Sequence, residues 1–256
     1  MEKKLLLVVV VLMVVALAGS AALALAPMGP PTAGLKTGQL RAGAEYSYSN
    51  ADFKVDWSGG EEYTAKDVKL NMIFANIGYG LTDDWEALVR LGAANAKGEY
   101  YEDEDVISGD SKFAFGLGTK YTFLKQENIN WGALFQITWL KSEFTDSGTY
   151  DDTTWEETFK LDAIGIEIAV GPTWKVAEGL SIYGGPFFNF INGSVDDDYS
   201  ETDSPTDSWS ADVKQKSIFG GYVGAQLDLS QNASVFAEFQ FTGAGETFAT
   251  GVGWKF

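Results

Sequence analysis

The sequence predicts an all-β fold, a transmembrane antiparallel up-and-down β-barrel of about ten strands. Apolar and polar residues alternate with a period of two from about residue 38 to residue 256, which is the pattern of strands with two different faces. The connections alternate between short and long, as in barrels that cross a membrane. The 29 glycines and the 14% of aromatic residues also suit a barrel better than a helical bundle.

The first 24 residues have the pattern of a secretory signal peptide. Lys3 and Lys4 form a basic start, and an uncharged apolar run extends from Leu5 to Ala18. Small residues follow, and Ala22-Leu23-Ala24 offers a cleavage site after residue 24. The alternative is a retained membrane anchor, because the apolar stretch can be read through Ala26 and about 20 residues span a bilayer.

The rest of the chain divides into a lead-in and a barrel. Residues 25–37 are rich in proline and glycine and are predicted to be a flexible lead-in. The barrel is expected to occupy residues 38–256. The formal net charge of −18 argues against a nucleic-acid partner, which would require basic patches.

Ten segments alternate over lengths near or above the ~9–11 residues that a tilted membrane strand requires. The predicted strands lie near 38–57, 64–79, 85–97, 111–123, 130–144, 156–176, 180–192, 212–229, 233–242 and 246–256. The second segment is ambiguous, because Leu70 and Met72 occupy one phase and Ile73 and Ile77 the other. Pro172 and Pro186 each remove a ladder donor, so we expect a β-bulge or a locally broken ladder there.

The connections indicate which ends of the strands share a side of the membrane. Short turns are predicted at 80–84, 124–129, 176–179 and 230–232. Longer, mostly acidic loops are predicted at 57–63, 98–110, 145–154 and 193–211, while 243–245 is an unexpectedly short member of this second group. An even number of strands leaves both termini on the short-turn side, which is expected to be periplasmic.

The strongly apolar face should point outward to lipid, and the polar, glycine-rich face should point into the lumen. A soluble β-sandwich would reverse these roles, and alternation alone does not separate the two. Aromatic residues near the strand ends, such as Trp85, Trp131 and Trp254, favour the membrane barrel. The inward candidates include Arg41, Glu45, Glu86, Arg90, Lys112, Lys120, Gln136, Glu167, Lys175, Asn189, Gln226, Asp228, Glu238, Gln240 and Lys255.

Some of these charges are expected to close the lumen. Glu86 and Arg90 lie four residues apart on one strand and therefore share a face. Unpaired charges would be costly in a low-dielectric lumen, so opposite charges should pair across the barrel. The predicted ion-pair network comprises Arg41, Glu86, Arg90, Lys120, Glu167, Asp228, Glu238 and Lys255. The alternative is that each charge is separately hydrated in an open pore.

The end of the chain, Phe248-x-Thr250-x-Val252-x-Trp254-x-Phe256, resembles the C-terminal signature of bacterial outer-membrane β-barrels. The turn at 79–85 is similar to the tight turns of small porin-like and OmpA-like barrels. The resemblance covers about 38–256 as architecture. It implies the Gram-negative outer membrane, contact with its lipid and lipopolysaccharide, and recognition of the last strand, with Trp254 and Phe256, by the barrel-assembly machinery.

The composition limits the chemistry. The chain has no Cys and no His, which excludes a disulfide scaffold, thiol chemistry and a Ser-His-Asp arrangement. No catalytic residue and no cofactor is therefore expected. The acidic runs Glu102–Asp105 and Asp196–Asp198 offer ligands for divalent cations, although a solvated, self-repelling loop is the alternative.

These expectations favour a non-enzymatic outer-membrane barrel with a narrow lumen that ion pairs close. Its role would be structural or would lie in surface interactions through the acidic loops. The alternative is a narrow passive porin-like channel for small solutes or ions. Barrels of about eight strands are filled by side chains, whereas open aqueous channels have about sixteen.

Overall fold

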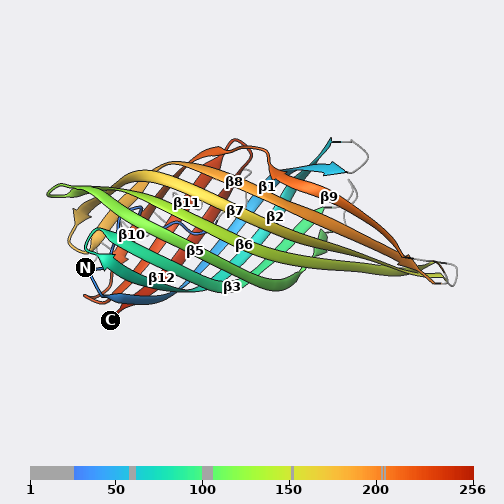
Figure 1. The fold of residues 1–256 in the computed structure, drawn as a ribbon, viewed down its shortest axis with the longest axis horizontal. Coiled ribbons are helices and arrows are strands. Elements are labelled where there is room, and N and C mark those ends of the chain that lie inside the picture. Colours follow the sequence, from blue (N-terminus) through green and yellow to red (C-terminus); the bar gives the residue numbers. More distant parts are fainter. Residues whose placement is uncertain (1–25, 58–61, 100–105, 151–152, 203, 205) are drawn as a thin grey trace.

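The computed structural model describes residues 26–57, 62–99, 106–150, 153–202, 204 and 206–256. They form one antiparallel sheet of twelve strands that closes on itself, as Figure 1 shows. No helix in these residues is long and apolar enough to cross a membrane. The closed antiparallel sheet is the predicted up-and-down barrel and not a sandwich of two sheets.

The strands follow one another around the wall. They are β1 Leu40–Trp57, β2 Glu62–Thr82, β3 Trp85–Glu99, β4 Val106–Ser108, β5 Asp110–Lys125, β6 Ile129–Tyr150, β7 Thr153–Ala177, β8 Leu180–Glu201, β9 Asp207–Gln215, β10 Phe219–Asp228, β11 Ala233–Thr242 and β12 Gly245–Lys255. Apart from the short β4, consecutive strands pair with each other except β9 and β10, and pairing of β1 with β12 closes the ring. The C-terminus lies at the end that carries the short turns (Figure 1).

The ring has different strand numbers at its two ends. At the short-turn end, the described residues form ten strands, namely β1–β3, β5–β8 and β10–β12. At the opposite end β9 lies between β8 and β1, so that β1–β3 and β5–β9 make eight. We call these parts the short-turn half and the loop half. The strand predicted at 212–229 is thus two strands, because β8 pairs with β9 in one half and with β10 in the other.

The change in strand number explains the unexpectedly short connection at 243–245. Strands β11 and β12 have only 10 and 11 residues, so their turn lies partway up the wall rather than at its end. There β1 changes partner from β12 to β9, with a register shift between Ala51 and Phe53. The amide of Asp52 donates to the carbonyl of Ala244 at 3.2 Å across this junction.

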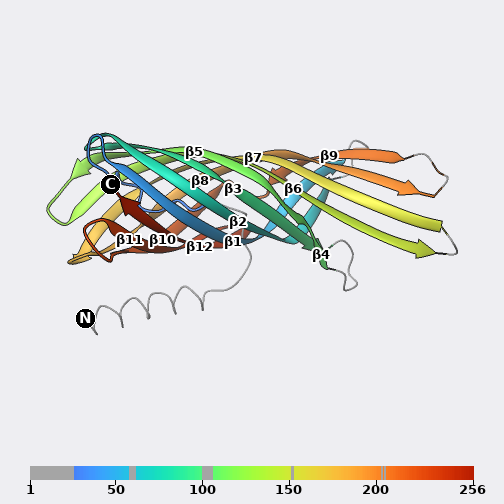
Figure 2. The same cartoon turned by 90° about the horizontal axis from the view of Figure 1, so that it is seen from below.

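The β6–β7 and β8–β9 hairpins, which we call the ribbons, extend far beyond the rest of the wall (Figure 2), and pairing of β7 with β8 joins them into one sheet. Strand β7 has 25 residues, which corresponds to about 80 Å of extended chain, whereas a ~30 Å hydrocarbon core needs about ten tilted residues. The loops predicted at 145–154 and 193–211 are therefore wrong in part. Most of their residues continue the ladders of β6 with β7 and of β8 with β9.

The predicted break at the two prolines is present. Pairing of β7 with β8 stops after Ala169 and Phe187 and resumes at Thr173 and Tyr183. The intervening glycines bring the two backbones too close for side chains, because a Cβ on Gly171 would lie 1.8 Å from the Gly184 carbonyl oxygen. At Pro172, β7 remains paired with β6, and at Pro186, β8 remains paired with β10.

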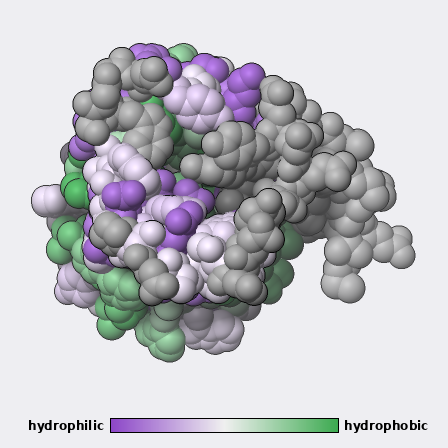
Figure 3. Space-filling view, turned by 90° about the vertical axis from the view of Figure 1, so that its right-hand side faces the viewer, coloured by the Kyte–Doolittle hydropathy of each residue, from purple (hydrophilic) through white to green (hydrophobic). Residues whose placement is uncertain are grey.

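The outer face is apolar, as predicted. Large side chains such as Ile73, Leu117 and Val252 are exposed on the wall, and Trp85, Trp131 and Trp254 are exposed near the short turns. In β2 the ambiguity is resolved, since Ile73 and Ile77 face outward while the alternate residues are buried. Figure 3 views the molecule from the loop end and shows polar residues gathered there and apolar ones along the flank.

Candidate functional site

Residues 26–37 occupy the lumen of the short-turn half. This segment was expected to be a flexible lead-in, but Ala26 and Met28 are only 2% and 0% exposed. The prediction was wrong because proline and glycine content describes the conformations available to a chain and not the contacts that surround it. Inside the barrel, the free backbone groups of this irregular segment find partners on the inward side chains. We call residues 26–37 the lumen segment.

The inner end of the lumen segment binds to one buried carboxylate and one buried amide. Glu238 on β11 accepts hydrogen bonds from the amides of Met28 and Gly29, at 3.1 and 2.9 Å. Gln240 on the same strand donates to the carbonyl of Ala26 at 3.1 Å and to Glu238 at 2.6 Å. All of these groups are buried, so the charge of Glu238 is held by backbone donors.

The outer end of the lumen segment is fixed near the short turns. The amide of Gly34 donates to Glu86 at 2.9 Å, and the amide of Ala33 donates to Thr122 Oγ1 at 3.0 Å. At the rim, Asp83 accepts hydrogen bonds of 2.9 Å from both the amide and the hydroxyl of Thr37. These two bonds hold the pKa of Asp83 below its ordinary value.

Inward glycines provide the space that this segment occupies. A Cβ on Gly132 would lie 2.6 Å from the carbonyl oxygen of Pro31. A Cβ on Gly80 would lie 2.0 Å from that of Lys36. Gly116 makes room for the Arg90 side chain, because a Cβ on Gly116 would lie 3.3 Å from the Cβ of Arg90. The glycine-rich inner face is thus matched to a filled lumen.

Arg90 connects the wall to the lumen segment. Its side chain is 1% exposed, and its Nε donates to Glu45 on β1 at 2.7 Å. Its Nη1 donates to Gln136 on β6 at 2.7 Å, and its Nη2 donates to the carbonyl of Pro27. Gln136 in turn donates to Glu167. At this depth the guanidinium thus joins two strands of the wall to the lumen segment.

The other predicted network residues differ in burial. Arg41 pairs with the fully buried Glu86 at 2.6 Å, and Lys120 is buried in the same region. Lys255 lies at the rim and donates to the Gly34 carbonyl at 2.9 Å. Asp228 does not belong to the buried group. It is exposed at the end of β10, where the chain turns into solvent, and it accepts a bond from Gln226 at 3.2 Å.

Sequence reasoning omitted three polar residues from the network, although it placed them on the inward face. They are Glu45, Gln136 and Gln240. Glu45 lies four residues after Arg41 on β1, the same spacing that linked Glu86 to Arg90, and this signal could have identified it. The two glutamines carry no charge and were therefore not candidates for ion pairing. No pattern indicated that the main partner of the charges would be the lumen segment.

The loop half has a different interior. The inward face that was predicted to be polar for the whole barrel becomes mainly apolar beyond Gln136 and Glu167, where residues such as Leu70, Leu140 and Ile191 face inward. They surround a cavity of about 960 Å³ whose floor includes Ala26, the first described residue of the lumen segment. The lumen thus contains a filled polar half and a hollow apolar half.

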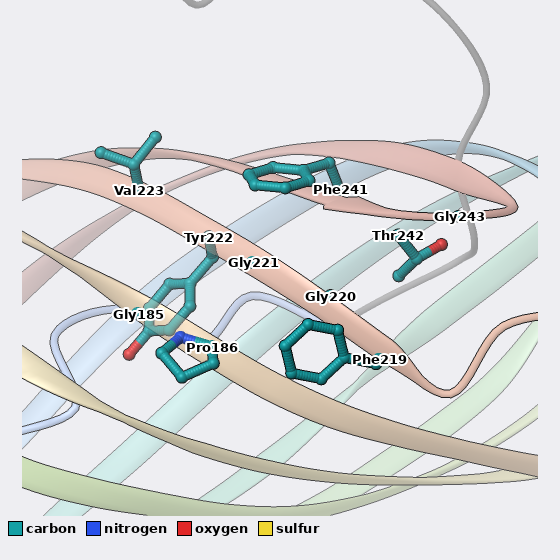
Figure 4. A pocket seen from close by; sticks show the side chains of 10 residues that line it. All are labelled: Gly185, Pro186, Phe219, Gly220, Gly221, Tyr222, Val223, Phe241, Thr242 and Gly243. Carbon is teal, nitrogen blue, oxygen red and sulfur yellow. The ribbon is translucent and has the colours of Figure 1, made fainter.

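A second hollow of about 630 Å³ lies on the outer wall of β10, shown in Figure 4. Its floor is Gly220 and Gly221, and the exposed Phe219, Val223 and Phe241 flank it. The neighbouring Tyr222 is 3% exposed. Because the flanking residues belong to the apolar outer face, this groove lies outside the lumen.

The described acidic residues of the ribbons form ion pairs. Asp198 accepts a 2.7 Å hydrogen bond from Lys160 Nζ across the protruding ribbons, which holds the pKa of Asp198 below its ordinary value. No group of three or more acidic residues in the described part of the chain could hold a metal ion. The run Glu102–Asp105 lies outside the described residues.

The comparisons with known proteins agree with the architecture. The family profile described as "Outer membrane protein beta-barrel domain" matches residues 12–183. No curated protein matches the chain.

Similar solved structures include the translocator domain of the autotransporter NalP from Neisseria meningitidis, with 15% identity over 87% of this chain and 90% of that one and a TM-score of 0.47. The outer membrane protease OmpT from Escherichia coli has 14% identity over 91% and 99%, with a TM-score of 0.46. Ail, the attachment invasion locus protein of Yersinia pestis, has 14% identity over 86% and 99%, with a TM-score of 0.34. The chain belongs to the outer membrane protein beta-barrel domain family and is a protein of the bacterial outer membrane.

Proposed function

We propose that this protein is a non-enzymatic barrel whose lumen is closed in the short-turn half, with a structural or surface-interaction role carried by its acidic ribbons. The observation that carries the proposal is the position of Arg90, which bonds Glu45, Gln136 and the carbonyl of Pro27 at one depth. A guanidinium bonded across the lumen in this way supports a barrel that does not act as a passive channel. The lack of His and Cys supports a role without covalent catalysis.

Conductance in planar bilayers tests this proposal. The chain without its predicted signal peptide, residues 1–24, should produce no steady current after refolding. Arg90→Ala should produce one, because it removes the group that joins two strands to the lumen segment. Arg90→Lys is the control that keeps the charge. If the wild-type protein already conducts and Arg90→Ala changes only the ion selectivity, the barrel is a passive channel instead.

The proposal includes an orientation, with the short turns and both termini in the periplasm and the ribbons at the cell surface. The much greater protrusion of the hairpins at the loop end supports this orientation. Because the chain has no native Cys, Asp83→Cys and Ser208→Cys can be labelled in whole cells by a reagent that does not cross the outer membrane. Labelling at position 208 alone is expected. Labelling at position 83 alone would reverse the orientation.

We further propose that Trp254 and Phe256 act in assembly. The side chain of Phe256 is 71% exposed, and its amide donates to the carbonyl of Leu40 at 2.9 Å. A side chain so exposed contributes little to packing within the barrel. Deleting Phe256 should therefore reduce the amount of folded barrel in cells more than the stability of protein refolded in detergent. Equal losses would mean that Phe256 acts only through packing.

A further inference from the structure

We propose that the apolar cavity of the loop half binds a hydrocarbon-chain molecule with an uncharged hydrogen-bonding end group, which enters end group first. The proposal concerns only the loop half, and it holds whether or not the short-turn half conducts ions. It rests on the walls of the cavity, the polar atoms at its floor and the acidic side chain beside them.

The walls suit a hydrocarbon chain. Leu70 and Met72 on β2, Leu140 on β6, Leu161 on β7 and Ile191 on β8 all line the cavity, so that apolar side chains surround it from several sides. Its volume of about 960 Å³ lies within the usual range of small-molecule sites, about 300–1,000 Å³. Small residues create this space, because side chains normally fill a ring of about eight strands.

The floor carries polar atoms without partners. Asn189 is 0% exposed, and neither its Oδ1 nor its Nδ2 has a hydrogen-bond partner among the described residues. Thr138 is 6% exposed, and its Oγ1 also has no hydrogen-bond partner among the described residues. Both residues line the cavity. Buried polar groups in proteins nearly always have partners, so these atoms are expected to bind a polar group of a ligand.

The chemistry of the floor selects an uncharged group. An amide and a hydroxyl together offer donors and acceptors, which suits an alcohol or a primary amide. Glu167 also lines the floor, and it lies directly opposite Asn189 in the register of β7 and β8. A ligand carboxylate would be buried here beside another carboxyl group and without a basic side chain at the floor, which is costly. The site should therefore discriminate against fatty acids.

The strand geometry sets the direction in which the bound hydrocarbon chain extends. From Asn189 the inward face of β8 continues through Ile191 to Val195, a step of six residues, or roughly 20 Å along the strand. Lys66, Asp67 and Lys97 lie among the lining residues on β2 and β3, toward the ends of these strands at the loop side. A chain anchored at Asn189 would thus extend toward the loop end, with its last carbons near Val195.

Photo-cross-linking tests the proposal. The probe is a twelve-carbon primary alcohol with a diazirine at the far end of the chain, added to the full refolded barrel in bilayers, and the labelled residues are mapped by mass spectrometry. The expected labels lie on Leu161, Val195 and Val213, and excess 1-dodecanol should suppress them. Labels on the lipid-facing Ile73 and Ile77 report simple partition into the bilayer. The matched probe with a terminal carboxylate should label the cavity several-fold less.

Two substitutions give the decisive comparison. Asn189→Leu should reduce cavity labelling by about fivefold or more, the effect of losing one or two net hydrogen bonds. Asn76→Leu is the control, since Asn76 is another buried amide that does not line the cavity. It should leave the labelling unchanged. The proposal is overturned if only lipid-facing residues are labelled, if the carboxylate labels the cavity as well as the alcohol, or if both substitutions act equally.

Discussion

The short-turn half of the lumen has ten strands, a charged interior and a chain segment packed within it, whereas the loop half has eight strands and an apolar, hollow interior. Ring size alone would predict the reverse, because a wider ring encloses more space. The wider half is filled because a segment that is not part of the wall enters it. The narrower half is hollow because small side chains, such as Ala96 and Ala163, face inward there.

The chemistry of each half follows from its contents. In the filled half, each irregular backbone group of the lumen segment needs a partner, and charged side chains are strong partners in a low dielectric. The apolar walls of the loop half require no partners and can remain separated. The loop half also carries exposed ion pairs, such as Lys160 with Asp198 on the ribbons, which water screens.

The largest expected difference between the halves concerns charged pairs. Arg90→Ala should lower the free energy of unfolding by roughly 3–5 kcal/mol, because it leaves Glu45 buried without its partner. Lys160→Ala removes a pair of the same length, 2.7 Å, on an exposed ribbon and should have a much smaller effect, because water screens that pair. Urea unfolding followed by tryptophan fluorescence measures both. Similar losses for the two variants would remove the distinction between the halves.

A matched pair of glycines sharpens the comparison of packing. Gly132→Ala should destabilise the barrel by about 1–3 kcal/mol, since the new methyl group meets the backbone of Pro31 and Thr32. Gly165→Ala in the cavity has no atom closer than 3.9 Å and should change stability by less than about 0.5 kcal/mol. The same unfolding experiment measures both variants. A larger loss of stability for Gly165→Ala would show that the loop half is the more tightly packed.

The smallest expected effect is the response to acid at the rim. The pKa of Asp83 is lowered by its bonds from Thr37, so its contribution is complete above the unfolded value of about 3.9 and is lost as the pH falls through the lower folded value. Hydrogen exchange at the Thr37 amide should accelerate only in that acidic window, after correction for intrinsic rates. The variant Asp83→Asn should abolish the transition. Acceleration between pH 5 and 7 would contradict the assignment.

The wall could be predicted from the sequence because its signal is local. Alternation with a period of two assigned the outer face, and the prolines at 172 and 186 marked the broken ladder. The split between β9 and β10 could not be predicted in this way, because residues 212–229 keep a strand-like composition while β8 changes its partner. Pairing of strands distant in sequence leaves no local mark.

Only part of the candidate site could be predicted, because alternation is a local signal. Alternation placed Arg90, Glu86 and Glu238 on the inward face, but it did not reveal what they contact. The lumen segment has no period and contains only one charged residue, Lys36, so nothing in it indicated burial. The apolar cavity was missed because the inward phase of β2 and β7 changes from polar to apolar partway along each strand.

The most direct test of the account is the conductance of a barrel without residues 26–36, compared with the wild-type protein in the same bilayer. Circular dichroism and resistance to unfolding in SDS establish beforehand that the shortened chain forms a barrel. The account predicts a silent wild-type protein and a steady current through the shortened one, because the hollow loop half then continues into an unfilled ten-strand half. A folded, shortened barrel that remains silent would contradict the claim that this segment closes the lumen.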